Sequence, residues 1–120
     1  MSAAAPTLNK RRVPRREVSA RIGLLHKGQY HLANAHEIGE GGLLVSCESL
    51  KLRKGDLVVV TLRIPGVIQG VVLGSIIYVT PEGRYGMSFD KIEFELKRQI
   101  RNFVASSTTG KTQASGTHGF

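Results

Sequence analysis

Alternating apolar and polar positions run through most of the chain and predict short β-strands. Val18, Ala20, Ile22 and Leu24 share one face of a strand over residues 18–25. Further strands, rich in Val, Leu and Ile, are predicted over 30–38, 43–45, 57–64, 67–80 and 84–89. Segments with Gly or Pro predict turns at 27–29, 39–42, 65–66 and 81–83. The pattern indicates a mainly β fold of about six antiparallel strands, which typically closes into a barrel or a sandwich.

The period of the pattern changes after residue 90. Apolar residues then recur at helical spacing, at Ile92, Leu96, Ile100, Phe103 and Val104. Asp90 is predicted to cap this C-terminal helix, because Glu93 follows three residues later as in a capping box. We expect the helix to cover an open end or edge of the sheet.

Glycines mark further irregular positions in the predicted strands. Gly70 and Gly74 interrupt a long β-branched stretch and predict bulges or bends. The 39–42 segment contains three glycines in four residues, which predicts a tight turn, because glycine permits positive φ.

The length of 120 residues favours a single domain. We expect a flexible lead over residues 1–9, one domain over 10–105 and a disordered, small and polar tail over 106–120. No apolar run approaches the ~20 residues that cross a bilayer. The N-terminus lacks the apolar region of a signal peptide, which predicts a cytoplasmic location.

The residues that usually carry catalysis or bind metals show no recognisable pattern. Cys47 is the only cysteine and is predicted to be a buried structural thiol. The four histidines are scattered, and neither a nucleophile motif nor a Walker loop is present. The sequence therefore predicts a binding module, not an enzyme, with no metal and no cofactor.

Positive charge is concentrated near the N-terminus. The net charge is +8, and Lys10, Arg11, Arg12, Arg15 and Arg16 all precede the first acidic residue. A guanidinium group binds phosphate and the guanine edge through two bonds and stacks on flat rings, and four of these five cations are arginines. A solvated basic arm is the alternative, but the composition favours a ligand with phosphate or guanine groups.

A second candidate segment is the glycine-rich turn between the second and third predicted strands. Glu37 precedes Gly39, Gly41 and Gly42. The glycines permit close approach of a ligand to the backbone, and a carboxylate accepts two parallel hydrogen bonds from a guanine. The alternative is a hairpin turn with no ligand.

Taken in this order, the two segments resemble the motifs of the PilZ domain family, the small β-barrel receptors for the bacterial second messenger cyclic di-GMP. Arg11 and Arg15 match the RxxxR motif, with Arg12 and Arg16 as an alternative register. Residues 37–42 lie where the family has [D/N]xSxxG, and residues 85–90 are similar to its last strand. The resemblance covers residues 10–105 and implies a six-stranded antiparallel barrel with a C-terminal helix.

The resemblance also implies a site and a mechanism. The arginines of one register would bind guanine edges and phosphates and stack on the bases. Glu37 and the backbone of 39–42 would bind the other side of a guanine. The basic arm would become ordered on binding and would regulate a separate effector protein of motility, pili or exopolysaccharide production. For this site to exist, residues 10–16 and 37–42 must lie together in space.

The second motif departs from the family pattern. Glu37 replaces Asp or Asn, and Gly39 replaces a serine whose hydroxyl contacts the ligand in the family. Gly39→Ser is therefore expected to tighten binding. Two alternatives remain open: an adaptor of the same fold that binds no cyclic di-GMP, and a basic nucleic-acid-binding barrel. No aromatic residues interleave with the arginines, which disfavours nucleic acid.

Overall fold

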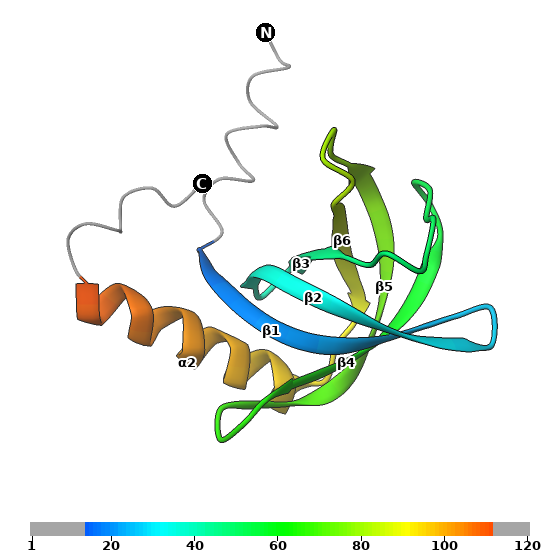
Figure 1. The fold of residues 1–120 in the computed structure, drawn as a ribbon. Coiled ribbons are helices and arrows are strands. Elements are labelled where there is room, and N and C mark those ends of the chain that lie inside the picture. The colour runs from blue at the N-terminus through cyan, green and yellow to red at the C-terminus, as the bar shows by residue number, and fades with distance from the viewer. Residues whose placement is uncertain (1–13, 112–120) are drawn as a thin grey trace, which may run out of the picture.

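The computed structural model describes residues 14–111, which form six strands and one helix (Figure 1). Arg11 and Arg12 lie outside the described residues. The elements are β1 (Arg15–His26), β2 (Gln29–Gly39), β3 (Gly42–Ser46), β4 (Leu57–Ile64), β5 (Ile68–Val79), β6 (Tyr85–Lys91) and α2 (Phe94–Lys111). The order of strands and helix agrees with the sequence prediction.

The six strands close into a barrel in the order β1-β2-β3-β6-β5-β4, and all neighbours are antiparallel. Between the alternatives of barrel and sandwich, the structure therefore selects the barrel. The closing contact joins β1 to β4 through only three paired positions, from Gly23 with Thr61 to Leu25 with Val59. Closure places the first strand beside a strand that begins more than thirty residues later, which no local pattern could indicate.

Two kinds of turn connect the strands. Lys27 and Gly28 both have positive φ, 49° and 81°, which matches the right-handed twist of a two-residue hairpin between β1 and β2. Gly66 and Gly83 also have positive φ in their predicted turns. The predicted tight turn at 39–42 joins β2 to β3, but none of its three glycines uses the positive φ that glycine permits.

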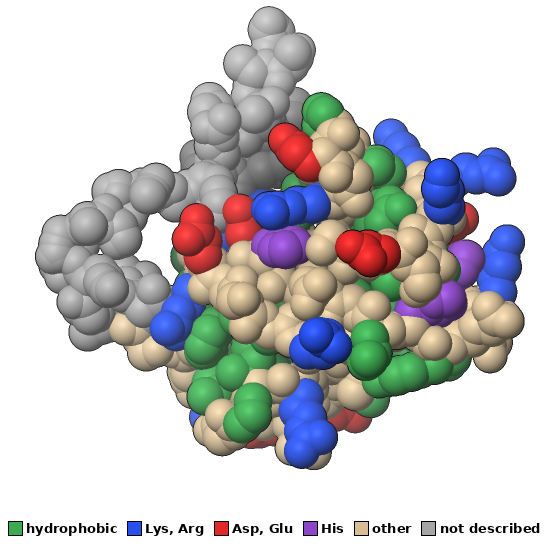
Figure 2. Space-filling view, viewed as in Figure 1, with side chains coloured by type: hydrophobic (Ala, Val, Ile, Leu, Met, Phe, Trp, Pro, Cys, Tyr) green, Lys and Arg blue, Asp and Glu red, His purple; other side chains and the backbone are tan. Residues whose placement is uncertain are grey.

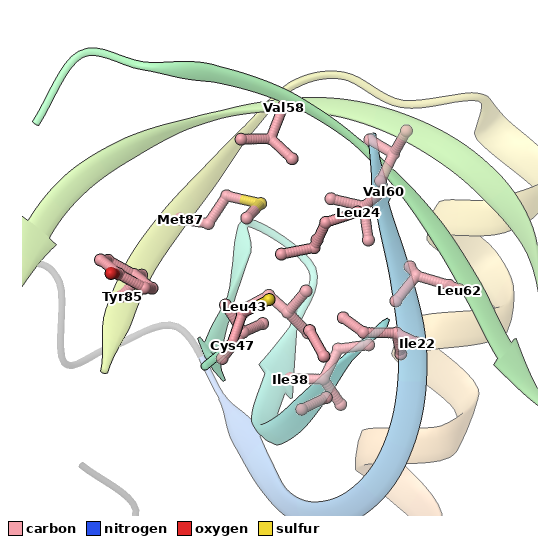
Figure 3. Packing of buried hydrophobic residues seen from close by; sticks show 14 of the residues in the cluster. Ile22, Leu24, Ile38, Leu43, Cys47, Val58, Val60, Leu62, Tyr85 and Met87 are labelled. Atoms are coloured by element: carbon pink, nitrogen blue, oxygen red, sulfur yellow. The ribbon is translucent and has the colours of Figure 1, made fainter. Parts of the chain in front are cut away.

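The barrel interior contains the apolar residues of each strand. Ile22 and Leu24 of β1 point inward with Ile38 of β2, Met87 of β6 and Val60 of β4, and all five are almost fully buried (Figure 3). Val18 and Ala20, which belong to the same predicted face of β1, are half-buried. Cys47, just after β3, is also buried, as predicted. Period-two alternation thus identified the core face of the strands.

The C-terminal helix packs against β5, β2 and β1 (Figure 1), and its Leu96 lies against Gly70 on the inward-facing side of β5. Its buried face consists of Leu96, Ile100, Phe103 and Val104, as the helical spacing predicted. Ile92, which the same spacing included, precedes the helix and is half-buried. The helix extends to Lys111, past the tail boundary placed at residue 105.

The predicted helix cap is wrong. Asp90 belongs to β6, and its Oδ1 accepts a hydrogen bond from Ser75 Oγ at 3.2 Å. The first helical hydrogen bond instead runs from the Lys97 amide to the Glu93 carbonyl. Asp90 fitted the sequence rule for a cap, but strand pairing with β5 extends through Lys91.

The two glycines of β5 have different roles. At Gly74 the pairing with β6 shifts register, which confirms the predicted irregularity. Gly70 is paired regularly with Leu62 of β4, and a Cβ there would lie 2.9 Å from Leu96 Cδ2. The bulge expected at Gly70 is therefore absent, and this glycine makes room for α2.

Candidate ligand-binding site

The start of β1 lies beside the end of β2, so the two sequence segments meet in space. Arg15 pairs with Gly39, and Glu17 pairs with Glu37. Both cross-strand pairs continue into β3, where Gly39 pairs with Gly42 and Glu37 pairs with Leu44. Arg15 and the glycine turn, more than twenty residues apart in sequence, therefore lie on one surface.

An open pocket occupies this surface, between the start of β1, the β2–β3 turn, β5 and β6. Arg15 and Glu37 form its polar side, while Leu44, Ile77 and Tyr78 form an apolar side. The complete lining consists of Arg15, Glu37, Gly39, Gly41, Gly42, Leu43, Leu44, Ile77, Tyr78, Gly86, Met87 and Ser88. A pocket with one charged side and one apolar side suits a ligand that has anionic and flat aromatic parts.

Arg15 and Glu37 form the charged pair of the pocket. Nη1 of Arg15 is 3.8 Å from Oε1 of Glu37, beyond hydrogen-bond distance for these two atoms. Their side chains retain 34% and 20% of their exposure, so each can still reach a group that enters from solvent.

The carboxyl of Glu37 experiences opposing influences on its pKa. Burial raises it, the guanidinium groups of Arg15 and Arg84 lower it, and the cross-strand carboxylate of Glu17 raises it. Burial is the largest effect, and the pKa of Glu37 lies above its ordinary value of 4.5. The ionised form is thus held in a partly dry place, where a hydrogen-bond donor from a ligand would stabilise it.

The three glycines of the turn serve different purposes. A Cβ on Gly39 would lie 2.8 Å from the Pro14 carbonyl oxygen and 3.1 Å from Arg15 Cγ, and one on Gly42 would clash with the Met87 carbonyl. Gly41 has open space around it. Gly39 and Gly42 are therefore required by the close approach of neighbouring strands, and both also line the pocket.

Arg16 does not line the pocket. It contacts α2 instead, where its guanidinium carbon lies 3.9 Å from the centre of the Phe103 ring. Its Nη1 donates to the Phe103 carbonyl at 2.9 Å and to Ser106 Oγ at 3.4 Å. Of the two motif registers, the geometry thus favours the one that contains Arg15.

Glu40, at the tip of the turn, also contacts the helix. Arg101 donates to both of its carboxylate oxygens, with distances of 3.0 Å from Nε to Oε2 and 3.3 Å from Nη2 to Oε1. Both halves of the site are therefore attached to α2, one through Arg16 and the other through Glu40.

Sequence reasoning missed the apolar wall and one cation. Tyr78 lies across Gly86, where a Cβ would clash with the aromatic ring, and 42% of its surface is exposed. Strand pairing brings Gly86 beside Leu44 and Leu44 beside Glu37. Arg84 acts on Glu37 from the turn before β6. An aromatic residue near the end of an apolar strand was a weak sequence signal for Tyr78, while no local pattern indicated a role for Arg84.

Within residues 14–111, no group of three His, Cys, Asp or Glu side chains is placed to bind a metal ion. The described part of the chain also contains no helix that is both long enough and apolar enough to cross a membrane.

A closed six-stranded barrel, a C-terminal helix and a mixed charged and apolar pocket define a small β-barrel domain with a candidate binding site. A family model for the PilZ domain matches residues 9–106, and the chain belongs to this family. PilZ domains are receptor and adaptor domains of cyclic di-GMP signalling. No curated protein matches the chain.

Solved structures show the same fold at low sequence identity. The chain is similar to the Bacillus subtilis inhibitor of motility, MotI/DgrA (TM-score 0.72, 12% identity, 84% of this chain and 52% of that chain). It is also similar to the Borreliella burgdorferi PlzA protein in complex with c-di-GMP (0.63, 15%, 86% and 45%). The PilZ domain of CeSA from a cellulose-synthesizing bacterium matches as well (0.58, 14%, 78% and 96%). The chain spans about half the length of the first two proteins.

Proposed function

We propose that this chain is a cyclic di-GMP receptor that regulates a separate effector protein in the bacterial cytoplasm. One observation supports the proposal above the others: the pairing of Arg15 with Gly39 brings both family motifs to one pocket. One of the similar structures supports it further, because it is that of PlzA in complex with c-di-GMP.

The pocket residues suggest how such a ligand binds. The Arg15 guanidinium binds a phosphate or the O6/N7 edge of a guanine, and Arg11 adds a second guanidinium from the preceding segment. The Glu37 carboxylate accepts hydrogen bonds from guanine N1–H and its amino group. Tyr78 offers a flat surface against which a base can stack. Gly41, which lines the pocket, is exposed and leaves its backbone accessible to a ligand.

The contacts to α2 suggest how binding is communicated. A ligand that displaces the start of β1 or the β2–β3 turn also displaces Arg16 or Glu40. These residues are hydrogen-bonded to Phe103 and Arg101 of α2. We further propose that α2 shifts against the barrel; the basic arm that is expected to become ordered over the ligand lies before residue 14, outside the described residues. A partner protein of motility, pili or exopolysaccharide production would recognise the changed surface.

The test is a calorimetric titration with cyclic di-GMP. Arg15→Ala should reduce affinity at least tenfold, because the loss of charge-assisted bonds costs about 1.5–3 kcal/mol. Arg21→Ala is the matched control, since Arg21 is an exposed arginine of the same strand that does not line the pocket. Equal losses in the two variants would overturn the assignment.

A second candidate is an adaptor of the same fold that acts without cyclic di-GMP. The observation that favours it is the absence of the family serine at Gly39, together with the lack of space for one. Heteronuclear NMR of the wild-type chain distinguishes the two. Shifts at Arg15 and at residues 37–42 on addition of cyclic di-GMP support the receptor, while unchanged spectra support the adaptor.

A further inference from the structure

The outer surface of the barrel carries a second feature, unrelated to the pocket. Apolar side chains point outward from four adjacent strands, and five of them are at least 40% exposed. We call this surface the apolar face; it consists of Leu25, Tyr30, Leu32, Leu57, Val59 and Val71. Monomeric soluble proteins rarely leave a contiguous apolar surface of this kind uncovered, and such surfaces typically bind partners.

Strand pairing shows that the apolar face is continuous. Tyr30 pairs with Leu25, and Leu25 pairs with Val59. In the next row Leu32 pairs with Gly23, which pairs with Thr61, and Thr61 pairs with Val71. Gly23 creates no gap, because a Cβ there would clash with the Tyr30 hydroxyl: the tyrosine side chain covers this position.

Two arginines border one side of the apolar face. Arg21 and Arg63 are exposed, and each lies two residues beyond Gly23 and Thr61, the last pair that joins β1 to β4. Neither forms an ion pair with another residue in the described part of the chain. Figure 2 shows Lys and Arg side chains among the hydrophobic ones on the lower part of the molecule.

Two carboxylates near the apolar face already accept hydrogen bonds within the barrel. Asp56 Oδ2 accepts one from the Arg53 backbone amide at 2.9 Å and lies 3.8 Å from His26 Nε2. Asp90 accepts one from Ser75. Arg21 and Arg63 have no such contact to an acidic side chain in the described part of the chain, so their guanidinium groups can bind carboxylates of a partner.

We propose that the apolar face binds a partner protein through a segment with an apolar side flanked by Asp or Glu residues. Carboxylates beside such a segment can form bidentate pairs with Arg21 and Arg63. Tyrosine and arginine beside leucine is also the composition of protein interfaces, from which lysine is depleted. A second copy of this chain fits poorly, because a two-fold contact through this face would bring the same arginines together.

The apolar face and the pocket lie at different places on the same strands. Arg15 begins β1, whereas Leu25 lies near its other end, beside the β1–β2 hairpin. None of the six residues of the apolar face lines the pocket. The partner can therefore bind without covering the proposed ligand site, and the inference does not depend on cyclic di-GMP binding.

Photo-crosslinking in cells of the source organism tests the inference. A benzophenone amino acid replaces Leu32 in the full-length chain, and the captured peptide is sequenced by mass spectrometry. The matched control carries the same probe at Val79, an apolar residue that is 46% exposed but lies outside the apolar face. We expect the probe at 32, but not at 79, to capture a segment with apolar residues flanked by Asp or Glu.

A charge-reversed chain completes the test. Arg21→Glu with Arg63→Glu should abolish the cross-link, because carboxylates then repel those of the partner, while the amide spectrum should remain that of a folded barrel. Capture of the same proteins at both probe positions, or of none at position 32, would overturn the proposal. Cross-linking to another copy of the chain, or binding of the chain to phosphatidylglycerol vesicles that Leu32→Asp abolishes, would assign the face to self-association or to lipid instead.

Discussion

Arg101 of α2 forms a two-bond ion pair with Glu40, at the tip of the turn that separates β2 from β3. This pair and the stacking of Arg16 on Phe103 attach the helix to both sequence motifs of the candidate site. Because the attachment points lie next to Gly39 and Arg15, we expect a ligand in the pocket to change the position of α2.

Removal of the ion pair should separate the helix from the site. We predict that Arg101→Gln destabilises the fold by at most about 1 kcal/mol, because the pair is partly exposed and surface pairs contribute little. The change should nevertheless alter cyclic di-GMP affinity in calorimetry. Arg98→Gln is the matched control, since Arg98 bonds Glu95 within the same helix and does not reach the barrel. Identical titrations for both variants would argue against coupling through α2.

Conservative changes of the two neighbouring arginines should have opposite effects. Arg15→Lys keeps the charge but loses bidentate geometry, so we expect a weaker affinity for cyclic di-GMP and little change in stability. Arg16→Lys should lose the contact with Phe103 and lower the free energy of unfolding by roughly 1 kcal/mol, with affinity changed far less. Paired urea denaturation and calorimetry measure both quantities. The reverse pattern would favour the register that contains Arg12 and Arg16.

Gly39→Ser should weaken the site, contrary to the expectation from the family motif. The new Cβ would lie 2.8 Å from the Pro14 carbonyl oxygen, so the start of β1 must shift. Overpacking of this kind typically costs about 1–3 kcal/mol. Gly41→Ser is the control, because Gly41 is exposed, has no positive φ and has open space around it. Thermal unfolding and ligand titration of both variants provide the comparison; a tighter ligand complex in Gly39→Ser would show that the strand start adapts easily.

The pH dependence of cyclic di-GMP binding should report the ionisation of the Glu37 carboxyl group. Its pKa is raised above the ordinary 4.5, so the stability that the protonated form contributes is present below 4.5 and is lost as pH rises through the raised value. Binding has the opposite sign, because the ionised carboxylate accepts the guanine hydrogen bonds. Affinity for cyclic di-GMP should therefore fall as pH decreases from 7 towards 4.5. In Glu37→Gln this slope should disappear; the same slope in the variant would assign the titration to another group.

Gly42 is predicted to be a structural glycine. A Cβ there would clash with the Met87 carbonyl where β3 pairs with β6. Gly42→Ala should destabilise the barrel by about 1–3 kcal/mol in urea denaturation, because the strands must separate locally. Gly41→Ala should be close to neutral. If Gly42→Ala is equally stable but binds no ligand, its role lies in the pocket and not in strand packing.

Local pattern was sufficient for most of the secondary structure. Alternation at Ile22 and Leu24, and helical spacing at Leu96 and Ile100, correctly identified the buried faces. The failures occurred where a contact distant in sequence overrode a local rule. Asp90 fitted a helix cap but pairs within the sheet, and Gly70 fitted a bulge but makes room for Leu96.

The candidate site was predictable as two segments but not as a geometry. The type and order of Arg15, Glu37 and Gly39 indicated a guanine or phosphate ligand, because these groups carry the necessary hydrogen-bonding chemistry wherever they lie. Tyr78 of β5 lines the pocket, and Arg84, in the turn before β6, lowers the pKa of Glu37. Only strand pairing across the barrel brings these two residues near the site. Likewise, the packing of α2 decides that Arg16 contacts the helix while Arg15 lines the pocket.

By itself, the sequence determined which residues are apolar, which turns can form and which charged groups are available, since these are properties of single residues and their near neighbours. Barrel closure decided which of those groups share a surface, because antiparallel register sends alternate residues to opposite sides and joins strands that are distant in sequence. Closure placed Arg15 beside Gly39 and Leu25 beside Val59. The pocket and the apolar face are consequences of that register.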